Sequence, residues 1–292
     1  MVGELELVLD VKATLGEGPC WDNVKHLLYW VDILEKKIYI FNPVTNENRL
    51  IQLEQYVGVI VPRSSDEAVL ALENGFYFLK YDTEKVSPID EPESHLTNNR
   101  FNDGTCDAYG RFWAGTMDKS YAKEQGALYC LDTNFKVKKK LNKVGISNGI
   151  TWSPDNKFMY YIDTLTKKVC RFNYNIVTGD IENPIDIISF SVGQGMPDGM
   201  TIDEEGMLWI AHWGGSKVSR WNPETGKQIT TIEVPALNVT SCIFGGKDLS
   251  ELYITTARTG LSEEQLNNYP FSGGLFRIKT DVKGSPCYSF KG

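Results

Sequence analysis

Four short motifs of the chain place a side-chain oxygen beside a glycine. They read LGEG around Glu17, RFNDG around Asn102 and Asp103, SNG at Asn148 and PDG at Asp198. Asn-Gly and Asp-Gly are strong signals for tight turns, so the simplest interpretation is that these residues only turn the chain. If their side chains met around one point instead, their carboxylate and amide oxygens could hold a hard divalent cation.

A pattern of a polar turn followed by two apolar strands recurs along the chain. Clear copies are WDNVKHLLYWVDILEKKIYIFNP, WSPDNKFMYYIDTLTKKVCRFNY and IDEEGMLWIAHWGGSKVSRWNP. A period near forty residues, with about four strands in each unit, is typical of β-propellers. The sequence therefore predicts an all-β fold, a six-bladed β-propeller with four-stranded blades that forms a single domain over residues 1–292. Successive units lie 40, 43, 48, 48 and 44 residues apart when aligned on Trp30, Leu70, Trp113, Tyr161, Trp209 and Tyr253.

The four motifs occupy nearly the same position within their units. Glu17 and Asn148 precede the alignment residue by 13 positions, and Asn102 and Asp198 precede it by 11. In a propeller, equal position within the unit means equal height and equal radius, so these side chains should converge on the central channel. Turns chosen for geometry alone would not share this position, and clear turns such as DAYG, SPDN and DEEG lie elsewhere in the units. The neighbouring glycines would let the backbone approach the crowded axis.

Glu17, Asn148 and Asp198 together offer only oxygen donors, two carboxylates and one amide. Such a set suits Ca²⁺, Mg²⁺ or Mn²⁺ with waters in the remaining positions, whereas Zn²⁺ is possible but less natural without His or Cys. Without a cation, the crowded carboxylates would repel each other and raise each other's pKa. The spacing alone leaves a purely structural channel lining open as the alternative.

Closure of the ring needs a contact between the two ends of the chain. We predict that LELVLD near the N-terminus pairs into the last blade beside GGLFRIK and PCYSF, which would cover an open sheet edge. Little of the chain is typical of helix; SEEQLNN could form one short helical turn.

The overall composition narrows the possible partners. A net charge of −8 argues against nucleic acid or an anionic membrane surface. The chain has no long uncharged stretch, so no membrane span is predicted, and the acidic N-terminus does not resemble a signal peptide. Six cysteines without CxxC spacing are typical of reduced, buried thiols. We therefore expect a cytoplasmic protein without nucleic-acid or membrane partners, and a monomer or weak dimer.

Five motifs in order resemble the regucalcin/gluconolactonase family, which includes the luciferin-regenerating enzyme. They are LGEGPCWD, NNRFNDGTCDAYGRFWAGTM, SNGITWSPDNKFMYYIDT, PDGMTIDEEGMLWIAHW and TSCIFGGKDLSELYITTAR. The resemblance implies a six-bladed propeller that hydrolyses sugar lactones with one divalent cation, of which Ca²⁺ is favoured and Mg²⁺, Mn²⁺ or Zn²⁺ are alternatives. By position, Glu17, Asn148 and Asp198 match the family's metal ligands.

The same resemblance implies that Arg100 and Asn102 face the substrate, and Asp103 belongs to the same motif. Some members of the family place an acidic substrate contact shortly after AGTM, where this chain reads Asp118-Lys119-Ser120. The resemblance does not fix which residue of this loop takes that role.

The hypothetical mechanism is hydrolysis of a cyclic ester. A cation would polarise the lactone carbonyl, and Asp198 would accept the proton of the attacking water. Three alternatives stay open: a calcium-binding regulatory protein without turnover, a propeller esterase or phosphotriesterase, and an interaction platform. The chain contains no GxSxG elbow. His212 could line the channel or belong to the core, and Trp213 could border the substrate.

Overall fold

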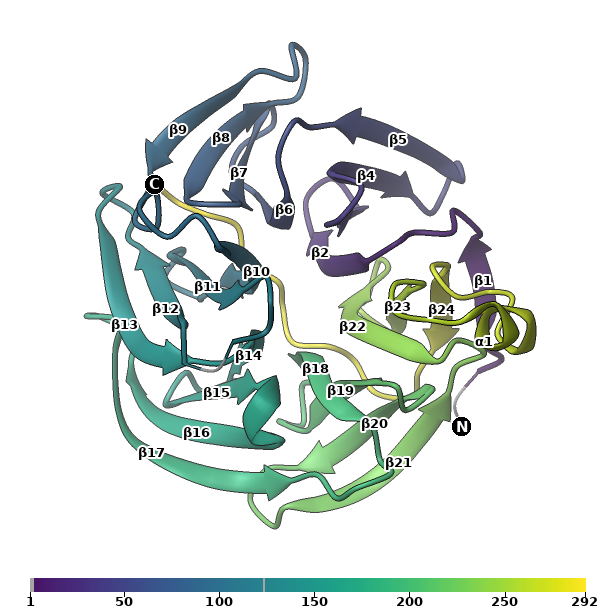
Figure 1. Ribbon diagram of the computed structural model, residues 1–292. Coiled ribbons are helices and arrows are strands. Elements are labelled where there is room, and N and C mark those ends of the chain that lie inside the picture. The colour runs from purple at the N-terminus through teal and green to yellow at the C-terminus, as the bar shows by residue number, and fades with distance from the viewer. Residues whose placement is uncertain (1–2, 123) are drawn as a thin grey trace.

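The computed structural model describes residues 3–122 and 124–292. They form six four-stranded antiparallel sheets arranged as blades around a central hub (Figure 1). This arrangement confirms the predicted six-bladed β-propeller. In five blades the chain starts at the hub and moves outward strand by strand, so that the first strand of each blade lines the hub.

Each blade runs from the hub to the rim through four strands. The first three blades consist of β2 (Gly16–Asp22), β3 (Leu27–Asp32), β4 (Lys37–Asn42), β5 (Glu47–Gln52); β6 (Val57–Pro62), β7 (Glu67–Leu72), β8 (Phe76–Lys80), β9 (Val86–Asp90); and β10 (Asn99–Cys106), β11 (Phe112–Asp118), β12 (Gly126–Leu131), β13 (Val137–Val144). The last three consist of β14 (Ser147–Trp152), β15 (Phe158–Asp163), β16 (Lys168–Asn175), β17 (Asp180–Ser189); β18 (Met196–Ile202), β19 (Leu208–Trp213), β20 (Lys217–Asn222), β21 (Lys227–Glu233); and β22 (Asn238–Gly245), β23 (Glu251–Ala257), β24 (Leu275–Lys279), β1 (Glu6–Leu9).

The ring closes in the sixth blade, where the N-terminal strand β1 is the outermost strand. It pairs antiparallel with β24, and Leu7 lies opposite Phe276. The predicted pairing of LELVLD with GGLFRIK is confirmed. This closure gives β24 a partner on its outer edge and ties the start of the chain to the last blade.

The C-terminal segment 283–292 does not join the sixth blade, so the prediction for PCYSF is wrong. The segment crosses the hub instead (Figure 1), and we call it the C-terminal strap. Its backbone is held by other blades: Ser285 N donates to Ile202 O at 3.0 Å, and Phe290 N donates to Pro62 O at 2.9 Å. β1 occupies the outer edge of β24, and the strap instead finds backbone partners in the second and fifth blades.

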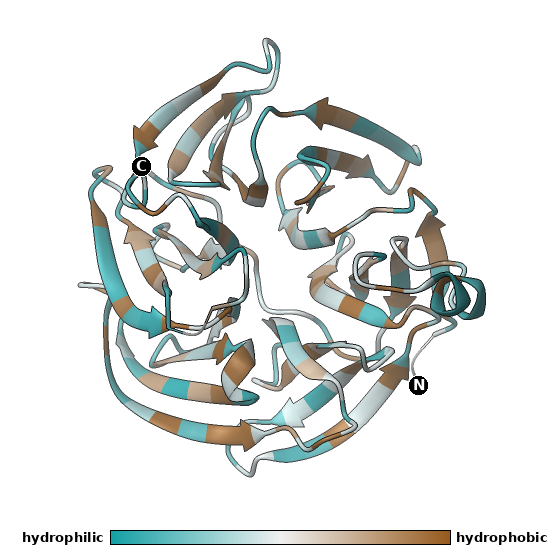
Figure 2. Cartoon of the chain, viewed as in Figure 1, coloured by the Kyte–Doolittle hydropathy of each residue, from teal (hydrophilic) through white to brown (hydrophobic). Residues whose placement is uncertain are grey.

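The six residues used to align the repeats all lie in the second strand of their blade and are buried. Two of them are anchored in the same way. The indole Nε1 of Trp113 donates to Asp107 Oδ2, and that of Trp209 donates to Asp203 Oδ2, both at 2.9 Å. The second strands of the blades carry many buried hydrophobic residues, whereas the outer strands alternate hydrophilic and hydrophobic residues (Figure 2). Each blade therefore buries its faces against its neighbours in the ring.

Every hub-lining strand carries a register irregularity of the β-bulge type. In all six, the shift falls in the first half of the strand, for example between Glu17 and Cys20 in β2 and between Pro197 and Met200 in β18. The motifs with Asn-Gly and Asp-Gly therefore lie inside strands, and the interpretation as tight turns is wrong. A bulge turns a side chain away from its regular direction without ending the strand.

Glycines at these bulges allow neighbouring hub strands to come close. A Cβ atom on Gly149 would lie 2.6 Å from Met200 Cβ, and one on Gly199 would lie 2.1 Å from Ser241 Oγ. Both contacts are with the next blade, so the predicted role of these glycines in close approach is confirmed.

Helix is limited to two short segments within the described residues, the 3₁₀ helix η1 (Thr164–Thr166) and α1 (Glu263–Asn268). Helix α1 coincides with the expected helical turn in SEEQLNN and starts with a capping box between Ser262 and Gln265. No helix within residues 3–122 and 124–292 is long and apolar enough to cross a membrane. All six cysteines are free, and four of them are buried, as expected.

We predict that Gly199→Ala destabilises the protein. The new methyl group would overlap Ser241 of the next blade, and overpacking of this kind costs about 1–3 kcal/mol. Thermal unfolding should show a melting temperature several degrees lower. Adding Ser241→Gly to the variant removes the clashing side chain and should restore part of the loss, whereas an unchanged melting temperature for the single variant would contradict the close approach.

Candidate active site

The N-terminal halves of the hub strands surround a cavity of about 300 Å³, which we call the upper cavity. Five of the six predicted site residues line it, and their exposed fractions are only 3–6%. They come from four different blades, so the structure brings them together as the repeat spacing predicted. The five are Glu17, Arg100, Asn102, Asn148 and Asp198. The other lining residues are Leu15, Met117, Tyr121, Ile146, Thr164, Leu165, Met196, Trp213 and Thr259.

The amide of Asn148 is held in one orientation by Thr164 of its own blade, which is itself fixed by the next blade. Its Nδ2 donates to Thr164 Oγ1 at 2.9 Å, and Thr164 Oγ1 donates to Pro197 O at 2.8 Å. The amide oxygen Oδ1 is buried and accepts no hydrogen bond. A buried acceptor without a donor costs about 1–3 kcal/mol, so this oxygen needs a partner that the protein itself does not supply.

Arg100 and Asn102 form a rigid pair on one wall of the upper cavity. Arg100 Nη1 donates to Asn102 Oδ1 at 2.6 Å and to Phe101 O at 3.0 Å. Asn102 Nδ2 in turn donates to Ser147 O of the next blade at 2.9 Å. The oxygen of Asn102 is thus occupied by Arg100, while the other guanidinium nitrogens of Arg100 are left for a ligand in the cavity.

The carboxyl groups in the hub are crowded and poorly solvated. Burial, and secondarily the charge of Asp103, raises the pKa of Glu17 to about 8. Burial and then the charges of Glu17 and Asp103 raise the pKa of Asp198 well above its ordinary value, although Asn148 and Arg100 oppose this shift. The hub therefore favours either protonated carboxyls or a bound positive charge.

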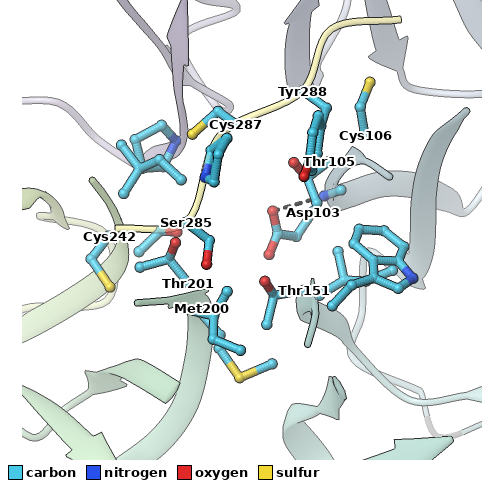
Figure 3. Close-up of a pocket in the computed structure, with 18 of the residues that line it drawn as sticks. Asp103, Thr105, Cys106, Thr151, Met200, Thr201, Cys242, Ser285, Cys287 and Tyr288 are labelled. Atoms are coloured by element: carbon cyan, nitrogen blue, oxygen red, sulfur yellow. Dashed lines mark hydrogen bonds between the residues drawn. The ribbon is translucent and has the colours of Figure 1, made fainter. Parts of the chain in front are cut away.

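Asp103 faces a second cavity, of about 120 Å³, which we call the lower cavity. Its carboxylate accepts from Gly104 N at 2.7 Å and points into the same space as the hydroxyls of Thr151 and Ser285 (Figure 3). The strap residues 285–288 form part of the lining of this cavity. Asp103 is thus separated from Arg100 and Asn102 although it is adjacent to them in sequence; its role in substrate binding stays a prediction.

The loop after AGTM turns its acidic residue away from the upper cavity. Asp118 accepts hydrogen bonds from Ser120, Asn98 and Ala122, and these contacts, chiefly that of Ser120, lower its pKa to about 2. Asp118 therefore caps the loop. The residue of this loop that lines the cavity is Tyr121.

His212 is part of the fifth blade's interior and does not line the upper cavity. One ring nitrogen, Nδ1, lies 2.7 Å from Gln194 O, and Nε2 lies 2.5 Å from Ser219 Oγ. Because a carbonyl only accepts, Nδ1 carries the proton and Nε2 accepts from the Ser219 hydroxyl. Burial lowers the pKa of His212 to about 4, so the ring is neutral. Trp213, by contrast, lines the upper cavity as expected.

Several residues that line the upper cavity were not predicted, although the sequence contains a signal for three of them. Leu15, Ile146 and Met196 each stand two positions before a predicted ligand. Since side chains alternate along a strand, a residue two positions away points to the same side. Thr164 and Leu165 follow β15 and offered no comparable signal.

Comparison with known proteins identifies the family. Residues 15–258 match the family model described as the SMP-30/Gluconolactonase/LRE-like region. The chain belongs to this family. YvrE of Bacillus subtilis, provisionally named a sugar lactone lactonase, is 40% identical over 286 residues, and the match covers 98% of each chain.

Solved structures of other members of the SMP-30/gluconolactonase family agree in fold. Luciferin-regenerating enzyme is 33% identical with a TM-score of 0.94, and the match covers 99% of this chain and 100% of that one. A regucalcin from Agrobacterium tumefaciens, described as a calcium-binding protein, is 27% identical with a TM-score of 0.95, over 99% and 98% of the two chains. The resemblance inferred from the five motifs is confirmed.

We predict that His212 makes the protein less stable in mild acid. Its folded-state pKa lies below the ordinary value of 6.5, so the folded protein binds this proton less readily than the unfolded chain. The stability is complete above pH 6.5 and is lost as the pH falls toward 4, by about 2 kcal/mol at pH 5.

The measurement compares urea unfolding of the wild type and His212→Gln at pH 7 and pH 5. The hub carboxyls titrate in both proteins, so the difference between the two isolates the histidine. Equal losses of stability in the two proteins would contradict this assignment.

Proposed function

We propose that the protein is a divalent-cation-dependent hydrolase of sugar lactones. The relative YvrE, which is named a sugar lactone lactonase, supports the reaction class. The observation that carries the cation is the buried Oδ1 of Asn148, which accepts no hydrogen bond and lies in a cavity with Glu17 and Asp198. In the described part of the chain, no three His, Cys, Asp or Glu side chains form a metal-binding group, so the third side-chain donor would be this amide.

The donor set fits a hard cation. Glu17, Asn148 and Asp198 would hold it through oxygen atoms, and two carboxylates with a neutral amide favour Ca²⁺, with Mg²⁺, Mn²⁺ or Zn²⁺ as alternatives. A positive charge would also offset the repulsion that raises the pKa values of the two carboxyls. With three side-chain donors and open space above them, such a site would keep positions free for substrate.

The reaction is attack of water on the carbonyl carbon of a cyclic ester, which opens the ring to a hydroxy acid. The bound cation would supply Lewis acidity at the carbonyl oxygen. Asp198, which a bound positive charge would keep ionised, accepts the proton of the attacking water at a carboxylate oxygen. Arg100 donates its free N–H groups to a substrate hydroxyl, and Asn102 keeps the guanidinium in place.

Removal of the cation tests the proposed function most directly. A panel of aldonolactones is assayed with chelated protein and again after reloading with Ca²⁺. We expect hydrolysis only in the reloaded protein. Cation binding without hydrolysis of any lactone would instead favour a calcium-binding protein without turnover.

We predict that Asp198→Ala lowers lactonase turnover at least about 100-fold, the size expected for loss of a general base. The assay uses saturating cation, because Asp198 would also contribute to its binding. Turnover near that of the wild type, with the cation bound, would remove Asp198 from the catalytic role.

We predict that Thr164→Val weakens cation binding about 10-fold, because its hydroxyl fixes the amide of Asn148 and such supporting contacts typically matter by about 10–100-fold. Calorimetric titration with Ca²⁺ measures the affinity independently of activity. Thr166→Val in the same 3₁₀ helix is the matched control, because Thr166 is exposed and its hydroxyl donates to Asp163 O. Equal affinities in the two variants would contradict the positioning role.

A further inference from the structure

The lower cavity contains a buried negative charge without a counter-charge. Among the described residues that line it, Asp103 is the single charged one, and no Lys, Arg or His side chain faces this space. The exposed fraction of Asp103 is only 8%. Charged groups that are removed from water in proteins are normally paired or bound to an ion. The carboxylate of Asp103 therefore needs a positive partner that the lining of this cavity does not supply.

The carboxylate of Asp103 has one oxygen engaged and the other directed into the cavity. Oδ1 accepts from Gly104 N at 2.7 Å, whereas no described residue donates a hydrogen bond to Oδ2, which points into the open space (Figure 3). Burial raises the pKa of Asp103 to about 6, and the hydrogen bond from Gly104 limits the shift. The group is thus ionised at pH 7–8 in spite of its burial.

Two hydroxyl oxygens point into the same space from other parts of the chain. Ser285 Oγ, on the strap, donates to Asp203 O at 3.1 Å, so its proton is used and its lone pairs are left for the cavity. Thr151, in β14, has no hydrogen-bond partner for its hydroxyl among the described residues and faces Asp103 across the cavity (Figure 3). Oxygen atoms from two blades and the strap therefore converge on one point.

We propose that the lower cavity binds a monovalent alkali cation, Na⁺ or K⁺, through Asp103, Thr151 and Ser285. One carboxylate with neutral hydroxyls balances one positive charge, whereas a divalent cation would leave an excess charge in an enclosed space. Calcium sites, in addition, gain affinity from the number of charged ligands, and this cavity offers one. The site is distinct from the upper cavity, and the proposal does not depend on the lactonase function.

The sulfur atoms of the lower cavity do not favour a soft metal instead. Cys106, Cys242 and Cys287 line it, and burial raises the pKa of all three thiols above the ordinary value. They are consequently neutral at physiological pH, and a soft metal ion binds the thiolate form. Oxygen is the donor that this cavity presents.

An ion at this position would connect β10, β14 and the strap, so we expect alkali cations to stabilise the fold. The test measures thermal unfolding at pH 8 in NaCl, KCl and choline chloride at equal concentration, since choline is too large for the cavity. An ion present at about ten times its dissociation constant raises the folding equilibrium constant about 10-fold, which corresponds to a melting temperature about 2–4 °C higher. Equal melting temperatures of the wild type in the three salts would overturn the proposal.

Two substitutions in the lower cavity locate the ion. Asp103→Asn should remove the difference between alkali and choline salts, because the charged ligand is lost. Thr151→Val keeps the charge and the shape of the side chain but removes one oxygen, so it should reduce the difference. If Asp103→Asn does not fold, Thr151→Val decides alone, and a full difference between the salts in either variant would contradict the assignment.

Glu17→Gln is the matched control, because it also removes one buried carboxylate of the hub but lines the upper cavity. The difference between the salts should persist in this variant. Its loss in Glu17→Gln together with its persistence in Asp103→Asn would place the alkali cation in the upper cavity and overturn the proposal.

Discussion

A β-bulge in each hub-lining strand is the constraint on which the rest of the molecule depends. The bulges occur at nearly the same position in all six strands, so the residues beside them meet around the hub. A regular strand would send alternate residues to its two faces and into the neighbouring blades. The bulge redirects a polar side chain to the axis while the ladder continues on both sides. Small residues such as Gly199 then let adjacent strands approach closely enough for their side chains to meet.

The close packing of the hub strands also brings several acidic side chains together with only one cationic side chain, Arg100, among the described residues there. The charge of Asp103 raises the pKa of Glu17 and of Asp198, and the charge of Glu17 also raises that of Asp198, whereas Arg100 opposes both shifts. His212 is buried to a similar degree, but its ring is satisfied on both sides by neutral partners. Burial thus has opposite consequences in the two places: it leaves the histidine inert and leaves the carboxyls in need of positive charge.

The repeat and the convergence of the donors could be predicted because position along the chain maps directly to position in a ring. Trp30 and Trp209, for example, are equivalent in sequence and in space. Orientation at the bulge could not be predicted, because the irregularity shifts the alternation. Asn102 and Asp103 are neighbours in sequence, yet they line different cavities.

The path of the strap and the direction of Asp118 in the loop before Tyr121 could not be predicted from the sequence either. PCYSF is compatible with a strand, but β1, from the other end of the chain, occupies the outer edge of β24, and the strap pairs with backbone groups of other blades. Asp118 is an acid in the expected loop, but its direction is set by hydrogen bonds to Ser120 and Asn98 that no periodic pattern encodes.

The strap also decides how molecules pass through the hub. Residues 285–288 lie over the lower cavity, so a ring that could have been open at both ends is covered at one of them. A ligand of the upper cavity would therefore enter and leave on the side of the hub opposite the strap. A hydroxy acid formed at the donors would have to clear the same passage before the next molecule could arrive, which makes the outgoing acid a natural competitor of the incoming ester.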